Sequence, residues 1–134
     1  MSFIVREGDL TTTGGFVLAA SASEVIELRR VARMGDPVWC PACRQIGFIA
    51  QGNPTYIDEL VAVATLGHEV QCGCAPGSNT LTTSQEHVRA DMDATVAIPE
   101  ELASTARLYA EHLARSLRDG SYTPEVLRPL SQPC

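Results

Sequence analysis

The sequence predicts a mainly β protein, a small conical β structure with a pseudo-threefold repeat, followed by one C-terminal α-helix. Two observations support this. Residues 1–90 consist of short apolar runs separated by glycine and proline turns, and three of these runs share one pattern around a glycine. From Pro99 onward the apolar residues follow the three- and four-residue steps of a helix. We therefore divide the chain into a β-cone, residues 1–90, and a C-terminal extension, residues 91–134.

The repeat is centred on Gly8, Gly35 and Gly67, which stand 27 and 32 residues apart. In each copy a short apolar run leads into Gly-Asp or Gly-His, and a second short run follows. Glycine supplies the positive φ of a turn without steric cost, and Asp can bond back to the nearby backbone. We therefore expect three similar β arms around one axis. The copies span residues 4–13, 31–40 and 63–72.

The regions between the copies also favour short strands. Residues 16–18, 25–28 and 48–50 are rich in β-branched and aromatic side chains, and glycine or proline turns follow or precede them. No long amphipathic helix is indicated before residue 97. The first ninety residues are therefore expected to be all-β.

Composition excludes several classes of partner. The net charge is −6 and only ten residues are basic, all of them arginine, so the chain has no electrostatic footprint for nucleic acid or anionic lipid. No apolar run approaches the roughly 18 residues of a membrane-spanning helix, so we expect no stable membrane anchoring. Residues 1–9 lack the pattern of a secretory signal, which favours a cytoplasmic protein exported, if at all, by another route.

The cysteines form two close pairs, Cys40 with Cys43 and Cys72 with Cys74. Without a signal sequence such pairs indicate metal ligands before disulfides, although a disulfide framework stays open. Four thiolates match the ligand number of a structural zinc site, and residues 72 and 74 of an extended strand point to one side. The predicted ligands of a structural zinc ion are therefore these four cysteines. Cys134 is interpreted as incidental.

The repeat supports convergence of these thiols. The position five residues after each repeat glycine holds Thr13, Cys40 and Cys72. If a pseudo-threefold axis relates the copies, these three side chains converge on it, where one ion can be held.

Histidine remains an alternative to Cys43 or Cys74 in the ligand set. His68 occupies the position that Asp9 and Asp36 hold in the other copies, so we expect an exposed loop residue. His87 follows the last expected strand and could fold back toward the site. His112 is expected to be a solvated helix residue.

No catalytic constellation is evident. Four protein ligands leave no open coordination position for a reactive water. The serines and histidines form no known nucleophile motif, and the glycines match no phosphate-binding loop. We therefore expect no enzymatic activity.

The C-terminal extension predicts one helix over about residues 99–118. Pro99 suits the first turn, Glu100 and Glu101 complement the positive end of the helix dipole, and Gly120 is a stop signal. The helix is expected to pack on the β-cone, with docking of an effector, adaptor or chaperone as the functional alternative. Residues 121–134 contain three prolines and are expected to be a loose end. The expected apolar stripe consists of Leu102, Ala106, Tyr109, Leu113 and Leu117.

Four motifs, in this order, resemble the PAAR domain family. They are Gly-Asp-Leu-Thr-Thr-Thr-Gly-Gly at 8–15, Arg-Val-Ala-Arg-Met-Gly-Asp at 30–36, Cys-Pro-Ala-Cys at 40–43 and Cys-Gly-Cys at 72–74. The resemblance runs from about residue 5 to about residue 88. It implies a PAAR-like β-cone over residues 1–90 that caps and sharpens a trimeric VgrG-like spike of a type VI secretion system, with zinc close to the vertex.

The resemblance also implies a route and a possible cargo. The protein would wait in the cytoplasm, leave with the spike without a signal peptide, and be able to carry effectors. The family commonly has histidine where this chain has Thr13, a poor zinc ligand, so the usual histidine-containing ligand set is in doubt here. Two other functions stay open: a free-standing zinc-binding interaction module, and a small secreted effector with its activity in the C-terminal extension.

Overall fold

The structure is a computed structural model that describes residues 2–121. The expectations for residues 122–134, including Cys134, lie outside the described residues.

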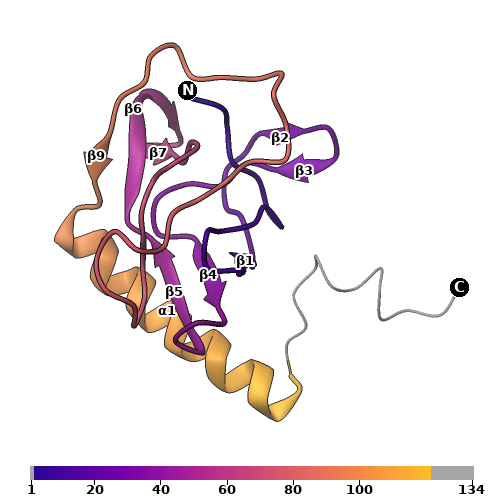
Figure 1. Ribbon diagram of the computed structural model, residues 1–134, viewed down its shortest axis with the longest axis vertical. Coiled ribbons are helices and arrows are strands. Elements are labelled where there is room, and N and C mark those ends of the chain that lie inside the picture. The colour runs from indigo at the N-terminus through magenta and orange to yellow at the C-terminus, as the bar shows by residue number, and fades with distance from the viewer. Residues whose placement is uncertain (1, 122–134) are drawn as a thin grey trace, which may run out of the picture.

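The described chain is mainly β with one helix at its end, as the sequence predicts (Figure 1). The elements are β1 (Phe16–Val17), β2 (Val25–Ile26), β3 (Arg29–Arg30), β4 (Pro37–Cys40), β5 (Gln45–Ile49), β6 (Gln51–Asp58), β7 (Val61–Val63), β8 (Val70–Gln71), β9 (Val96–Ala97) and α1 (Glu100–Asp119). The sheets are antiparallel, with strand orders β1-β4-β5-β8, β2-β3 and β7-β6-β9.

A closed cycle of backbone hydrogen bonds joins the three arms. Val5 N–H donates to the Ala64 carbonyl at 3.0 Å, Ala64 donates to Ala32 at 2.9 Å, and Ala32 donates to Val5 at 3.0 Å. Such a cycle requires three equivalent segments around one axis, so the pseudo-threefold repeat is confirmed. Two further cycles repeat the pattern: Glu7 to Arg30, Met34 to Ala62 and Leu66 to Phe3; and Leu18 to Pro37, Ala50 to Glu69 and Thr82 to Leu10.

The repeat glycines make the same turn in each arm. Gly8, Gly35 and Gly67 have φ of 86°, 91° and 89°, a region that favours glycine. The residue after each glycine accepts a hydrogen bond from the backbone N–H three residues earlier. The pairs are Arg6 N–H to Asp9 at 2.8 Å, Arg33 N–H to Asp36 at 2.8 Å and Thr65 N–H to His68 Nδ1 at 3.0 Å.

The prediction that His68 is an exposed loop residue was wrong, because its side chain is 4% exposed. The ring folds back over its own turn, where Nδ1 accepts the Thr65 N–H and Nε2 lies 3.2 Å from Thr95 Oγ1. Nδ1 is therefore unprotonated and Nε2 carries the proton. His68 thus replaces the turn carboxylate of the other arms with a neutral ring that also holds the segment leading to α1.

The core is built from equivalent residues stacked along the axis. Val5, Ala32 and Ala64 are each 0% exposed and form one layer. A second layer of the same cluster consists of Val17, Ile49 and Leu81. A third layer consists of Val38, Val70 and the buried Thr11.

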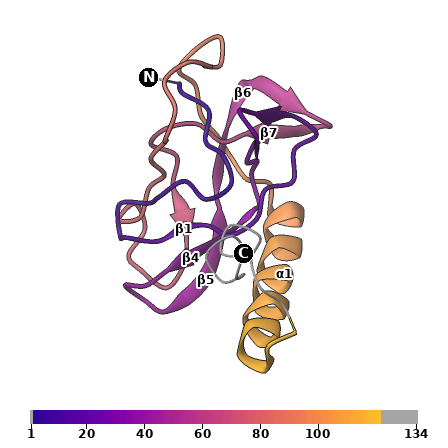
Figure 2. The same ribbon diagram turned by 90° about the vertical axis from the view of Figure 1, so that its right-hand side faces the viewer.

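The helix lies along the outer face of β5 and β4 (Figure 2). Pro99, which the sequence places in the first turn, is its N-cap, and Gly120, with φ of 80°, ends it as predicted. The predicted apolar stripe was partly wrong, because Tyr109 is 46% exposed. Small residues face the sheet instead, and they allow the helix to lie close to Phe48. The buried helix residues are Ala103, Ala106, Ala110, Leu113 and Ser116.

Among the described residues no helix has the length and apolar character that crossing a membrane requires.

We predict that His68 makes stability fall with acidity. Burial lowers the pKa of His68 below its ordinary 6.5, so as pH falls through 6.5 the unfolded chain binds a proton that the folded chain refuses. This contribution is complete above pH 6.5 and is lost toward the lower folded-state pKa. In His68→Asn an amide oxygen can still accept the Thr65 N–H, and we expect a cost of about 1 kcal/mol at neutral pH but no acid-dependent loss from this site.

The measurement is urea unfolding of both proteins between about pH 7.5 and 5. The readout is the difference between the two curves of unfolding free energy against pH. Burial raises the pKa of Asp36 to about 6, and this gives both proteins the same opposing trend, which cancels in the difference. Asp93, which lines the same pocket as His68, is also common to both. Parallel curves would contradict the prediction.

Candidate metal centre

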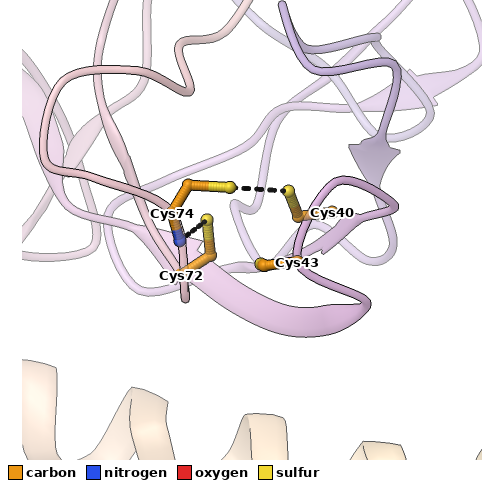
Figure 3. Close-up of side chains that lie close together, drawn as sticks. All are labelled: Cys40, Cys43, Cys72 and Cys74. Carbon is orange, nitrogen blue, oxygen red and sulfur yellow. Dashed lines mark hydrogen bonds between the residues drawn. The ribbon is translucent and has the colours of Figure 1, made fainter.

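Four cysteine thiols meet at one end of the β structure (Figure 3). Cys40 ends β4, Cys43 lies in the turn to β5, and Cys72 and Cys74 follow β8. Their sulfur atoms all lie within 4.8 Å of one another. Cys40 is buried and the other three are partly exposed. The structure thus brings together the four residues that the sequence singled out.

Strand pairing explains why the two pairs meet. In the β4–β5 hairpin Cys40 is paired with Gln45, and β5 is paired in turn with β8, Phe48 opposite Gln71. Gly47 allows this second pairing to be close, since a Cβ there would lie 2.8 Å from Cys72 Cβ. Thiols about thirty residues apart in the chain therefore become neighbours across three strands.

The geometry fits a tetrahedral ion. With Zn–S bonds of about 2.3 Å, a tetrahedron has sulfur–sulfur edges of about 3.8 Å. Cys40 Sγ and Cys74 Sγ are 3.7 Å apart. Two backbone N–H groups already point at sulfur, Gly73 to Cys43 at 3.2 Å and Cys74 to Cys72 at 3.5 Å. Such donors stabilise thiolates, so the site could hold a metal ion with modest adjustment.

Thr13 and Asn79 complete the surroundings of the thiols. Thr13 Oγ1 lies 3.3 Å from Cys40 Sγ and 3.2 Å from Asn79 Oδ1, and Asn79 Nδ2 donates to Cys72 Sγ at 3.6 Å. Asn79 is 1% exposed. Thr13, at the position of the first arm that is equivalent to Cys40 and Cys72, is therefore a hydrogen-bonding partner of a thiol. Sequence reasoning missed Asn79 because it lies in a Pro-Gly-Ser-Asn stretch that signals only a turn.

The thiols differ in acidity. Burial raises the pKa of Cys40, but hydrogen bonds from Thr13, Cys43 and Cys74 outweigh it and lower that pKa to about 6. The hydrogen bond with Cys40, and burial, raise the pKa of Cys74 to about 12, and burial raises the pKa of Cys43. Adjacent thiolates repel one another, so full deprotonation of the cluster needs a cation at its centre, and a divalent metal supplies that charge.

The histidines stay apart from the thiol cluster in the described residues. His68 is bonded within its own turn, while His87 and His112 are exposed. The group that could hold a metal contains cysteines alone.

Comparison with known protein families gives one finding for the chain. A family model described as the PAAR motif matches residues 7–76, slightly more than half of the chain. The matched residues include the three repeat glycines and all four clustered cysteines. No curated protein matches the chain.

We predict that Cys74→Ser removes most of the metal and lowers stability. Four thiolates are expected to hold one metal ion per chain, and the loss of one leaves an open position, so the ion binds more weakly. Metal at 100 times its Kd stabilises a fold by about 2.7 kcal/mol, so at least about that much should disappear. Elemental analysis of the purified protein and urea unfolding measure the two effects.

Cys134→Ser is the matched control and should keep the metal content of the unchanged protein. A Cys74→Ser protein that retains its metal would show that Cys74 is not a ligand.

We also predict that Gly47→Ala destabilises the fold by about 1–3 kcal/mol, because the added methyl group meets the backbone of Gln71 and the Cβ of Cys72. Gly73→Ala is the control. The three atoms nearest to its added Cβ would all lie at 3.0 Å in the flexible Gln45 side chain, which can move, so we expect a change in stability of about 0.5 kcal/mol or less. Thermal unfolding compares the two. Equal effects would refute the close strand contact.

Proposed function

This chain belongs to the PAAR motif family, and we propose that it caps a trimeric VgrG-like spike of a type VI secretion system and sharpens its end. The PAAR motif is associated with type VI secretion spike tips. One observation of the structure supports the proposal most directly. A single chain presents three equivalent arms, closed by the hydrogen-bond cycle of Val5, Ala32 and Ala64. Such a chain can match a threefold platform without being a trimer itself.

Two hairpins supply a surface suited to that platform. The β2–β3 turn exposes Leu28 to 98%, and the β6–β7 turn exposes Leu60 to 96%. Both leucines have positive φ, 71° and 74°, which is costly for a side-chain-bearing residue. In Figure 1 both hairpins lie at the end of the molecule away from the β4–β5 hairpin, which bears Cys40 and Cys43 of the thiol cluster. Backbone strain of this kind is concentrated at functional sites, so we assign both leucines to the proposed contact surface.

The thiol end is then the free vertex. A metal ion held by Cys40, Cys43, Cys72 and Cys74 would cross-link the arms where the core narrows and would make the tip rigid. We propose zinc, because a set of four thiolates suits it. With four protein ligands the ion has a structural role, and the proposed function of the chain is mechanical, with no enzymatic step.

The proposed function includes a route and a cargo. The protein would assemble with the spike in the cytoplasm and leave the cell as part of the firing machine, so it needs no signal peptide of its own. The helix α1 is the element through which an effector, adaptor or chaperone would attach.

We predict one chain of this protein per VgrG-like trimer. Purified protein mixed with a recombinant trimer should give a complex of that stoichiometry by size exclusion with light scattering. The double variant Leu28→Glu with Leu60→Glu should weaken the complex at least about tenfold, since it places charge in a desolvated contact.

Leu108→Glu is the matched control, because Leu108 is also an exposed leucine, at 67%, but lies on α1. It should leave the complex unchanged. Three chains per trimer, or no complex, would refute spike capping and would favour a free-standing metal-binding module or an effector.

A further inference from the structure

The outer face of the main sheet carries an apolar row that the helix covers only in part. Phe16 on β1 is paired with Trp39 on β4, and Trp39 is paired with Ile46 on β5. Cross-strand partners project to one face, so the three side chains form a row. All three are half-buried. The first half of α1 covers the neighbouring Phe48 with Ala103 and Ala106, but its second half leaves the row open.

A groove of about 900 Å³ lies between this row and the second half of α1. The row forms its floor. Ala114 and Leu117, both half-buried, contribute to its helix wall. The volume is within the range of sites that bind a ligand or peptide side chains.

The rim of the groove is basic in an otherwise acidic protein. Arg44, Arg107 and Arg118 line it, and Glu111 is the one acidic residue among the lining side chains. The whole chain, in contrast, has a net charge of −6 with ten arginines. Arg107 lies 5.6 Å from the centre of the Phe48 ring, so its charge is held over the apolar surface.

We propose that this groove binds an acidic amphipathic segment of another protein, with the apolar side chains of the segment on the Phe16, Trp39 and Ile46 row and its carboxylates on the three arginines. An apolar groove with a charged rim is a typical receptor for an amphipathic helix. Charge complementarity selects an acidic partner over a basic one. The site lies on another face than the hairpin leucines, and the proposal does not depend on spike capping.

The chain's own residues 122–134 fit this chemistry less well. They contain one acidic residue, Glu125, and one basic residue, Arg128. Such a segment offers little attraction for a rim of three arginines. The partner is therefore expected to be a separate, acidic chain.

Trp39 is the only tryptophan of the chain and forms part of the groove floor, so its fluorescence reports occupancy. The probe is a synthetic helical peptide of about 14 residues with leucines on one face and glutamates elsewhere. A second peptide with lysines in place of the glutamates is its counterpart. We expect the glutamate peptide to change the Trp39 emission with saturation, to bind at least about tenfold tighter than the lysine peptide, and to weaken as salt is raised.

The variant Arg44→Glu with Arg118→Glu should weaken the glutamate peptide at least about tenfold. Arg115→Glu is the matched control, since Arg115 is an exposed arginine of α1 outside the groove lining, and it should bind as the unchanged protein does. Circular dichroism and metal content confirm that each variant is folded.

Equal binding of the two peptides, insensitivity to the double reversal, or no binding at all would overturn the proposal. A chain that ends at Ser121 tests the remaining candidate occupant of the groove, residues 122–134. If the glutamate peptide binds this shortened chain but not the full chain, residues 122–134 fill the groove and the proposal is wrong. Similar binding by both chains supports it.

Discussion

The structure depends on the closed cycle of backbone hydrogen bonds that runs from Val5 to Ala64, to Ala32 and back. Each bond joins two arms, and all three are made only when the arms surround one axis. The side chains at these positions are fully buried, so the unpaired N–H groups of an open cycle would lie in an apolar core at a high cost in free energy. The cycle thereby holds the three arms in place around the axis.

The thiol cluster, the candidate metal centre, follows from this arrangement with one asymmetry. Threefold repetition places Thr13, Cys40 and Cys72 at equivalent positions, yet one of these side chains is a poor ligand. Cys43 and Cys74 supply the two missing thiols from neighbouring turns, and Thr13 and Asn79 hydrogen-bond to sulfur. Four thiols from two arms can thus serve where three symmetric ligands cannot, because a tetrahedral ion needs four donors and not threefold symmetry.

The helix shows how a local pattern can predict the extent of an element correctly and its buried face only in part. Residues 99 to 120 carry clear start and stop signals, and these depend only on neighbours in the chain. Which face turns inward depends on the sheet beneath it. Phe48 is bulky, so Ala103 and Ala106 pack on it while Tyr109 turns outward. The first half of α1 packs closely on Phe48, whereas its second half leaves the groove over Trp39 open.

The sequence by itself determined the β class, the repeat, the terminal helix and the four cysteines of the cluster, because turn glycines, strand propensity and paired cysteines act through local chemistry. Only the tertiary structure decided that His68 is buried as a turn acceptor, that Asn79 reaches Cys72, and that Phe16, Trp39 and Ile46 form one row. These depend on contacts between residues far apart in the chain. Their geometry is set by strand register and close packing, and neither is written in any single stretch of sequence.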